Sequence, residues 1–237
     1  MKSLAFSSTL KWLFPWSKRW ATLIGSPEQN SGSSQEHTQF VAPTNWNAIG
    51  GSTHVQAATK SLDIGCGRGK TPGSIGIDRI ALPGVDIVHN LDQFPWPFYN
   101  DEFSVIYANH FLEHVSDILG TLGEIHRIST ASGRLIVRVP HYASDNFHTD
   151  LTHKIAFGYR SFDHFSINGK TAYDFYVPFK FEILSRRIKF MSPLIRLDPF
   201  RLLGIEALAN MFPRIYERFF AYWLPPAEIQ FELRIVK

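Results

Sequence analysis

A glycine-rich turn behind a short apolar run constrains the fold of this chain more than any other feature of the sequence. In SLDIGCGRGKTPGSIGID, residues 61–78, Gly65 and Gly67 open a turn directly after the apolar run that contains Asp63. Glycines in a turn at the carboxyl end of a buried strand allow the backbone to approach a ligand closely. Asp78 ends the next apolar run, where its carboxylate can accept hydrogen bonds from both hydroxyls of a ribose.

The spacing of this turn argues against a dinucleotide cofactor. The fingerprint of dinucleotide-binding domains is GxGxxG, with an acidic residue about 20 positions further on. Here the spacing is GxGxG, and Asp78 follows Gly65 sooner than in that fingerprint. A nicotinamide-dependent oxidoreductase is therefore disfavoured, and it stays only as a third alternative.

The chain after residue 60 alternates apolar runs typical of strands with a segment typical of a helix. The predicted strands cover 61–65, 74–78, 85–90, 103–109, 133–140, 179–190 and 228–237. Short apolar strands joined by crossovers predict an α/β fold with a mostly parallel sheet that is buried on both faces. The last two strands alternate apolar and polar residues, so we expect them to close the sheet as a pair.

One long helix is predicted over 112–130, and the first crossover is predicted to lack one. The apolar residues of the helix recur at three- and four-residue steps, which predicts a stripe that packs on the sheet. The stripe consists of Leu112, Val115, Ile118, Leu119, Leu122, Ile125 and Ile128. We expect Ser129, Ser132 and Gly133 to end the helix. Residues 66–73 are fewer than the roughly one dozen that a helical crossover requires, so a loop or a single turn is expected there.

Composition narrows the class of protein further. With 237 residues, of which 44% are hydrophobic, the chain can bury one sizeable core. Cys66 is the single cysteine, so a disulfide framework is excluded, and we expect a cytoplasmic protein in which this residue fills a turn position without reacting. The net charge of +3 is small and the basic residues are scattered, which does not indicate nucleic-acid binding.

The N-terminal residues differ in composition from the rest. Residues 1–25 are basic and aromatic, with no acidic residue before Glu28, and their apolar runs are too short for a membrane span or a signal peptide. Such a segment can lie in the membrane interface at the inner face of the cell membrane, or it can be a disordered or core-docked tail. Residues 26–40 are polar and predict a flexible linker, so the folded domain is expected over 41–237.

Four sequence blocks within residues 60–165 resemble the class I S-adenosylmethionine-dependent methyltransferases. The DIGCGRG turn is similar to the family's DxGxGxG motif, and the second strand ends in an acid, Asp78. FPWPFYNDEFSVIYANHFLEHV and EIHRISTASGRLIVRVPHY are similar to two further blocks of the family. The chain looks like a bacterial, type 11-like subgroup with a shortened first crossover. The resemblance implies a Rossmann-like, mostly parallel seven-stranded sheet with an antiparallel C-terminal strand and a helical insertion before it.

The resemblance also implies that S-adenosyl-L-methionine is the cofactor and that nine residues bind it. These residues are Asp63, Gly65, Cys66, Gly67, Asp78, Asn90, Leu91, Asn109 and His110. The two glycines would pass the methionine end of the cofactor, Asp63 would organise their loop, and Asp78 would hold the ribose. Asn90 departs from the family, which usually has an aspartate beside the adenine; an amide still accepts a hydrogen bond but lacks the charge. Ser104 also replaces a common aspartate.

The loop over 140–157 holds the remaining polar candidates. In the family this loop lies over the acceptor pocket, and its candidates here are His141, Tyr142, Asp145, His148, Asp150 and His153. An imidazole titrates near neutrality and can remove a proton from the acceptor. The candidate bases are His110, His141, His148 and His153. The alternative is that these side chains only hold the loop in place. Their spacings match no zinc pattern, so we expect no metal. Glu113 and His114 are expected either to position a helix against the cofactor loop or to be solvated.

The segment 193–226, between the last two predicted strands, is unusually aromatic. We expect two short helices broken at Pro213, a residue that the first turn of a helix tolerates. Their predicted apolar face consists of Ile215, Tyr216, Phe219, Phe220 and Trp223. That face either packs on the sheet as a helical cover or forms a lid or interface element that admits an amphipathic acceptor.

Together these features predict a methyltransferase that acts on an oxygen or a nitrogen atom. The expected acceptor is a small molecule or a lipid-linked one, such as a precursor of a cell-surface saccharide, and any membrane contact would be peripheral. The alternative from a different class is a non-catalytic S-adenosylmethionine-binding module that attaches to a membrane or protein partner through its hydrophobic ends.

Overall fold

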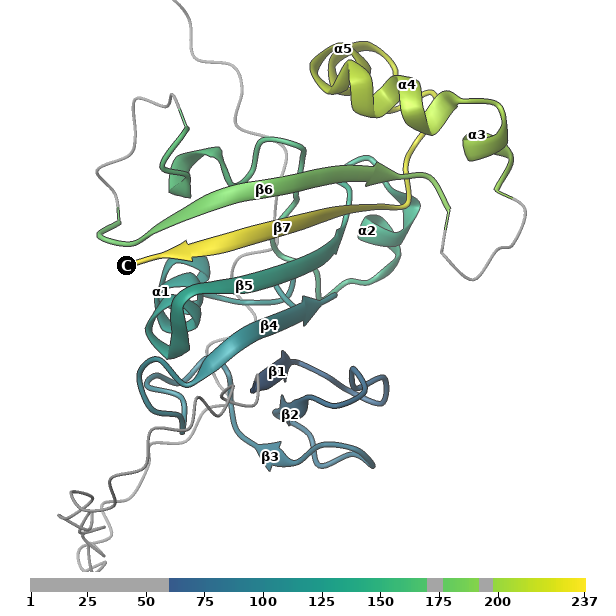
Figure 1. Ribbon diagram of the computed structural model, residues 1–237. Helices are drawn as coiled ribbons and strands as arrows, with labels where there is room; N and C mark the ends of the chain where they lie inside the picture. The colour runs from purple at the N-terminus through teal and green to yellow at the C-terminus, as the bar shows by residue number, and fades with distance from the viewer. Residues whose placement is uncertain (1–59, 170–176, 192–197) are drawn as a thin grey trace, which may run out of the picture. The chain divides into compact units, whose positions relative to one another are not determined.

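The computed structural model describes residues 60–169, 177–191 and 198–237 (Figure 1). The expected N-terminal segment 1–25, the expected linker 26–40 and the expected start of the domain at residue 41 lie outside the described residues. No helix among the described residues is long and apolar enough to cross a membrane.

The described residues form an α/β structure around a seven-stranded sheet (Figure 1). Its strands are β1 (Ser61–Ile64), β2 (Ile75–Asp78), β3 (Ile87–Val88), β4 (Phe103–Asn109), β5 (Ser129–Pro140), β6 (Lys180–Lys189) and β7 (Glu228–Val236). Their order is β3-β2-β1-β4-β5-β7-β6, and β7 runs antiparallel to both of its neighbours while the other pairs are parallel. The predicted mostly parallel sheet with an antiparallel C-terminal strand is therefore confirmed.

The central strand β1 positions the glycine turn. Leu62 and Ile64 are fully buried, as expected for a short apolar strand between two neighbours. Asp63 lies opposite Gly76 of β2 and Tyr107 of β4, so the turn behind β1 opens between the carboxyl ends of both neighbours. The helix α2 (Asp145–Thr149) lies at this same edge of the sheet (Figure 1).

The helix before β5 is shorter than predicted. It is α1 (Ile118–Ile128), and it begins after Asp117, whose side chain accepts a hydrogen bond from the Gly120 N–H at 2.9 Å. Leu112 and Val115 of the predicted stripe are buried, but they lie in turns that precede the helix, and Leu119 is largely exposed. The prediction of a helix from residue 112 was wrong because the carbonyl of residue 113 accepts hydrogen bonds from the N–H groups of residues 154 and 155.

Among the described residues, α1 is the only α-helix that lies in a connection between the parallel strands β1 to β5. The β1–β2 connection has no helix, as predicted from its length, and the β2–β3 and β3–β4 connections are also loops. Side-chain carboxylates replace helical hydrogen bonds in the first of these loops: Asp63 Oδ2 accepts from the Thr71 N–H at 2.7 Å. Asp86 Oδ2 accepts from the Gly76 N–H at 2.6 Å and from Lys70 Nζ at 2.8 Å.

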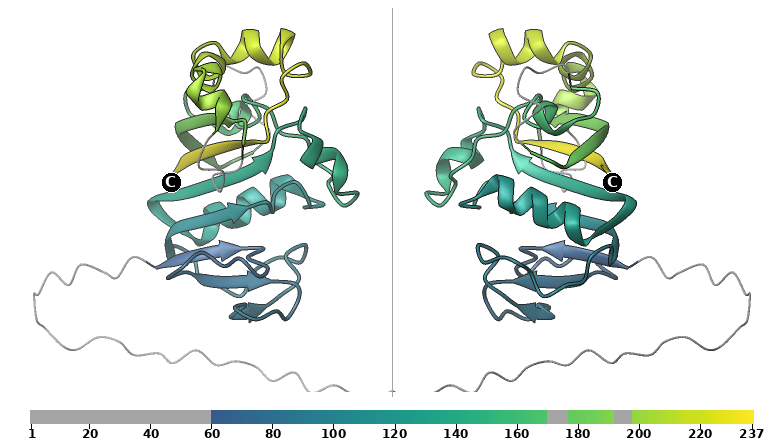
Figure 2. Two further views of the ribbon diagram at one scale, coloured as in Figure 1. Left: turned by 90° about the vertical axis from the view of Figure 1, so that its right-hand side faces the viewer. Right: turned by 90° about the vertical axis from the view of Figure 1, so that its left-hand side faces the viewer.

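Three short helices connect β6 to β7 and lie on the β6 side of the sheet (Figure 2). They are α3 (Pro199–Leu202), α4 (Ile205–Met211) and α5 (Pro213–Phe219). The predicted break at Pro213 is confirmed, because α4 ends at Met211 and Pro213 opens α5. Of the predicted apolar face, Tyr216 is buried, whereas four side chains are 47–85% exposed. These four are Ile215, Phe219, Phe220 and Trp223, and for them the alternative of a cover packed on the sheet is wrong.

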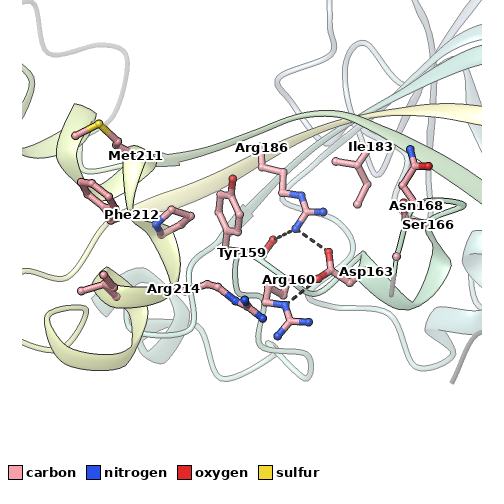
Figure 3. A pocket seen from close by; sticks show the side chains of 13 residues that line it. Tyr159, Arg160, Asp163, Ser166, Asn168, Ile183, Arg186, Met211, Phe212 and Arg214 are labelled. Carbon is pink, nitrogen blue, oxygen red and sulfur yellow. Dashed lines mark hydrogen bonds and ion pairs between the residues drawn. The ribbon is translucent and has the colours of Figure 1, made fainter. Parts of the chain in front are cut away.

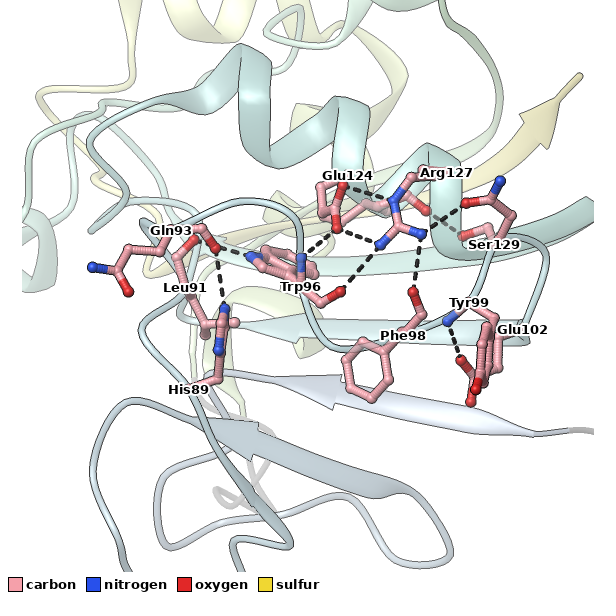
Figure 4. A network of polar contacts seen from close by, with 12 residues as sticks. His89, Leu91, Gln93, Trp96, Phe98, Tyr99, Glu102, Glu124, Arg127 and Ser129 are labelled. Atoms are coloured by element: carbon pink, nitrogen blue, oxygen red, sulfur yellow. Dashed lines mark hydrogen bonds and ion pairs between the residues drawn. The ribbon is translucent and has the colours of Figure 1, made fainter. Parts of the chain in front are cut away.

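A partly buried ion pair on α1, between Glu124 and Arg127, also bonds to the loop that precedes β4 (Figure 4). Arg127 Nη2 lies 2.5 Å from Glu124 Oε1, and the same oxygen accepts a hydrogen bond from the Trp96 N–H at 2.6 Å. Arg127 also donates to the carbonyl oxygens of Phe98 and Trp96. Burial acts to raise the pKa of Glu124, but the hydrogen bonds from Arg127 and Trp96 outweigh it, so the pKa lies below its usual value.

We expect Glu124→Gln to lower the free energy of unfolding at pH 7 by about 2 kcal/mol, because Arg127 would be left without its buried counterion. The lowered pKa gives the sign of the pH dependence: ionised Glu124 stabilises the fold above about pH 4.3, and this contribution is lost as the pH falls through the folded-state pKa. Urea unfolding of both proteins between pH 3 and 7 measures the difference, which should shrink toward acid pH.

The matched control is Glu232→Gln, which removes the partner of Arg134 in an ion pair that is largely exposed. Exposed pairs of this kind contribute less than about 1 kcal/mol, so this variant should unfold almost like the parent protein. Equal losses in the two variants would contradict the role given to the partly buried pair.

Candidate active site

A cleft of about 560 Å³ lies at the carboxyl ends of the central strands. Six of the nine predicted cofactor residues line it: Gly65, Gly67, Asp78, Asn90, Leu91 and His110. The other three, Asp63, Cys66 and Asn109, are not among its lining residues. Residues from the loop after α2, including Leu151 and Thr152, form part of its wall. The cleft therefore brings the glycine turn together with a segment that follows it by more than 80 positions in the sequence.

The glycine turn has a backbone that other residues rarely adopt. Gly65 and Gly67 have φ angles of 64° and 50°. A Cβ on Gly65 would lie 2.6 Å from Cδ2 of Phe111, which is closer than carbon atoms approach, whereas a Cβ on Gly67 would meet nothing within 4 Å. Gly65 is thus required by the packing of Phe111 against the turn, and Gly67 leaves its side of the cleft open.

The carboxylates beside the turn fit an S-adenosylmethionine-type ligand. Asp63 is almost fully buried, and its Oδ1 accepts no hydrogen bond from any described residue. Burial raises the pKa of Asp63, and an ammonium group near this oxygen would supply the missing partner. Asp78 Oδ2 accepts from the Gly67 N–H at 2.9 Å and Oδ1 from the Ile80 N–H at 3.0 Å, which orients the carboxylate at the cleft wall.

Four further predicted cofactor residues, Cys66, Asn90, Leu91 and Asn109, have mainly structural contacts. Cys66 is buried beside Gly76, and its burial, with the nearby charges of Asp63 and Asp78, raises the pKa of the thiol to about 11. The thiol is therefore protonated at neutral pH. Asn90 lines the cleft, and its Oδ1 accepts a hydrogen bond from the Asp92 N–H at 3.2 Å.

The backbone of Leu91 is also anchored, because Trp96 Nε1 donates to its carbonyl oxygen at 3.1 Å (Figure 4). Asn109 lies at the end of β4, where Nδ2 is 3.5 Å from Thr71 Oγ1. Its side chain thus bridges β4 to the β1–β2 loop.

His110 lies between two buried carboxylates at the mouth of the cleft. Its Nδ1 is 3.3 Å from Glu113 Oε1, and its Nε2 is 3.6 Å from Glu228 Oε2. Interactions with Glu113 and Glu228 raise the pKa of His110 to about 9. Glu228 in turn pairs with Arg138 at 2.9 Å. The sequence carries no local signal for this arrangement, because Glu228 comes from the last strand.

His141 is placed differently from the catalytic prediction. It is fully buried, its Nδ1 accepts from the Ala143 N–H at 3.1 Å, and its Nε2 lies 3.2 Å from Glu217 Oε1 of α5. Because Nδ1 is an acceptor, Nε2 carries the ring proton and donates a hydrogen bond to Glu217 Oε1, so the ring has no free lone pair to take a proton. Tyr142 donates from its hydroxyl to the Glu217 carbonyl at 2.9 Å, so both residues hold α5 against the loop.

The other loop candidates do not converge on one point. Asp145 and His148 are exposed on α2. Asp150 accepts hydrogen bonds from the N–H and the hydroxyl of Thr152 at 2.8 Å, which lower its pKa. His153 is largely buried, and its Nδ1 is 2.9 Å from the Phe147 carbonyl oxygen.

A second cavity of about 660 Å³ shares no lining residue with the cleft (Figure 3). It lies between β6, the segment 159–169 and the helices α4 and α5. Arg160 and Arg186 line it and both contact Asp163, at 2.8 and 2.7 Å. Arg214, at the start of α5, lines the same cavity. Its charged lining therefore carries more positive than negative groups.

The fold and the cleft define the class of protein. A sheet in the order β3-β2-β1-β4-β5-β7-β6, with a glycine turn behind β1 and an acid at the end of β2, is a Rossmann-like methyltransferase fold. The model of a methyltransferase domain family matches residues 28–173, which is more than half of the chain. The chain belongs to this family and is an S-adenosylmethionine-dependent methyltransferase of class I.

Several solved structures are similar to this chain. A SAM-dependent methyltransferase from Archaeoglobus fulgidus is 17% identical, with 76% of this chain and 87% of that chain covered and a TM-score of 0.48. The YcgJ protein from Bacillus subtilis is 16% identical, with 76% of this chain and 93% of that chain covered and a TM-score of 0.44. An S-adenosylmethionine-dependent methyltransferase from Mesorhizobium loti is 16% identical, with 74% of this chain and 90% of that chain covered and a TM-score of 0.39. A search of curated proteins found no match.

We expect Gly65→Ala to destabilise the protein by at least about 1 kcal/mol and to abolish binding of S-adenosylhomocysteine, because a side chain at positive φ is strained and its Cβ would displace Phe111. Thermal unfolding and calorimetric titration measure the two effects. The matched control is Gly69→Ala, where the new Cβ would meet nothing within 4 Å and φ is not positive. Identical behaviour of the two variants would show that the turn tolerates a side chain at position 65.

Proposed function

We propose that the enzyme transfers a methyl group to an oxygen or nitrogen atom of an amphipathic acceptor at a membrane surface. The observation that carries the cofactor half of this proposal is the orientation of Asp78 beside the glycine turn. The observation that carries the acceptor half is the exposed apolar surface of α4 and α5, part of which lines the cavity that holds the three arginines. The two halves are tested separately.

In the cofactor half of the proposal, different residues of the cleft bind different parts of S-adenosylmethionine. Asp63 supports the loop and faces the amino group, Gly65 and Gly67 pass the methionine end, and Asp78 accepts from the ribose hydroxyls. Asn90 and Leu91 lie where the adenine would bind. When bound, S-adenosylmethionine supplies a methyl group on a sulfonium, and the chain's own task is to align the acceptor with it.

The histidines of the loop then take unequal roles in this proposal. His141 is a positioning residue, because both ring nitrogens are engaged and the ring is fully buried. His148 is exposed on α2 and does not line the cleft. His114 and Thr152 line the cleft instead, so the acceptor would meet these two side chains first.

We expect Asp78→Ala to weaken S-adenosylhomocysteine binding by about 10- to 150-fold, the equivalent of about 1.5 to 3 kcal/mol for a hydrogen bond to a charged group. Calorimetric titration measures the affinity, and NADH serves as the negative ligand. Asp86→Asn is the comparison variant, since Asp86 also accepts a backbone N–H in this region but does not line the cleft. If both variants lose affinity equally, Asp78 orders the loop and does not hold the ribose.

The acceptor half starts from the side chains that α4, α5 and the following turn expose. Met211, Phe212, Phe219 and Trp223 are 48–85% exposed, and Arg214 stands beside the second cavity. Aromatic and aliphatic side chains next to arginines are the composition of a surface that binds at the level of anionic headgroups. The excess positive charge of the cavity fits a phosphate group of a lipid-linked acceptor.

We expect the full-length protein to bind vesicles that contain phosphatidylglycerol and to bind phosphatidylcholine vesicles less well. The double variant Phe219→Ser and Trp223→Ser should lose at least about tenfold in partitioning, because two apolar rings no longer enter the interface. Co-sedimentation with the vesicles measures the fraction of bound protein. Tyr99→Ser is the matched control, since Tyr99 is 78% exposed in the loop before β4.

The chemical class of the acceptor is tested by the fate of a labelled methyl group. Incubation with membrane extract and methyl-labelled cofactor should place the label in material that partitions into organic solvent, and Asp78→Ala should slow this transfer in proportion to its weaker cofactor binding. Label that appears only in water-soluble products would overturn the lipid-linked acceptor. Cofactor binding without any transfer would favour the non-catalytic binding module.

A further inference from the structure

Glu113, His114 and His153 converge at the wall of the cofactor cleft. One ligand atom of each lies within 4.8 Å of the others. The first two follow β4 and the third follows α2, and backbone hydrogen bonds join their segments: the Lys154 and Ile155 N–H groups donate to the Glu113 carbonyl at 2.7 and 3.2 Å. The cluster is therefore held by the fold itself, in two segments that are 40 residues apart.

The carboxylate of Glu113 lacks partners that its burial demands. The side chain is fully buried, and neither oxygen accepts a hydrogen bond from any described residue. Its nearest cationic group is His110, whose Nδ1 is 3.3 Å from Oε1. A buried carboxylate is costly unless it is paired, hydrogen-bonded or bound to a metal, so the second oxygen, Oε2, calls for a further ligand.

The hydrogen bonds of the two histidines engage Nδ1 of each ring and leave Nε2 without a hydrogen bond, with Asp150 Oδ2 at 3.9 Å from His153 Nε2. A carbonyl oxygen only accepts, so His153 Nδ1 donates its proton to the Phe147 oxygen at 2.9 Å, and Nε2 keeps a lone pair. The Thr152 hydroxyl donates to Asp150 Oδ1 at 2.8 Å, so its oxygen accepts from His114 Nδ1 at 2.9 Å, and His114 Nε2 also keeps a lone pair.

These outer contacts are of the kind that metal sites use. Histidine ligands usually donate their second N–H to a carbonyl or, directly or through a hydroxyl, to a carboxylate, which fixes the ring and its tautomer. Phe147 and Asp150 supply these two acceptors here. Two imidazoles and one carboxylate favour zinc and other first-row transition ions over magnesium, and they leave coordination positions open.

We propose that Glu113, His114 and His153 bind a divalent transition-metal ion of the zinc class. His114 lines the cleft, so the ion would lie at the cleft wall. In the part of the inference that rests on the proposed function, an open coordination position of the ion takes an oxygen or nitrogen atom of the acceptor and orients it. The expectation from sequence spacing that the protein has no metal is reversed by this proposal, because that expectation considered only residues 141–153.

The test uses the untagged, full-length protein after treatment with a chelator. We expect titration with Co²⁺ to produce visible absorption bands at one ion per chain, and Zn²⁺ to displace Co²⁺. Magnesium should bind at least about 100-fold more weakly than Zn²⁺. Glu113→Gln, His114→Ala and His153→Ala should each lower Co²⁺ affinity at least about 100-fold. His148→Ala, an exposed histidine of the same loop, should bind Co²⁺ like the parent protein.

The unfolding temperature is a second measurement of metal binding, and it also reports whether each variant folds. Zn²⁺ should raise the unfolding temperature of the parent protein and of His148→Ala but not that of His114→Ala, whose ring is only partly buried. Absence of a cobalt spectrum in the parent protein, or a spectrum that survives all three substitutions, overturns the site. S-adenosylhomocysteine binding by the metal-free protein tests the cofactor half of the proposed function on its own, so the two ideas fail separately.

Discussion

The site depends on a loop between β1 and β2 that has no helix to satisfy its backbone. Side-chain carboxylates take that place: Asp63, Asp78 and Asp86 each accept a hydrogen bond from an N–H group within the β1–β2 region. Because these acceptors are fixed, the two glycines behind β1 keep a positive φ and the cleft keeps its shape. The same carboxylates surround the turn with negative charge, which suits a ligand whose amino group and sulfonium are cationic.

Polar contacts between residues far apart in the sequence hold the other loops at the carboxyl edge of the sheet. Glu228 of β7 contacts His110, which follows β4, and Glu217 of α5 contacts His141, which follows β5. Each contact joins residues that are more than 70 positions apart, so these two histidines are held only when β7 and α5 are in place. The exposed apolar residues of α5 therefore lie on the helix that His141 and Tyr142 bind through Glu217.

Local patterns predicted much of the fold and part of the site. The glycine turn, Asp78, the loop crossover and the break at Pro213 follow from backbone chemistry that short stretches of sequence carry. The start of α1 could not be predicted from periodicity, because Leu112 and Val115 have helical spacing but lie in turns held by hydrogen bonds from residues 154 and 155. The exposure of Trp223 could not be predicted either, because the spacing of apolar residues identifies an apolar face but does not show what that face contacts.

The sequence by itself determined which strand ends carry the cofactor residues, because glycine and aspartate act there through local backbone geometry. Only the tertiary structure decided what each histidine can do. His141 resembles a catalytic base in the sequence, yet the Ala143 N–H occupies its Nδ1 and Glu217 its Nε2. His114 and His153 have no meaningful spacing, yet the fold brings both rings to Glu113, and Thr152 and Phe147 engage Nδ1 of each ring. The physical reason is that the tautomer of an imidazole depends on partners that folding alone brings into contact.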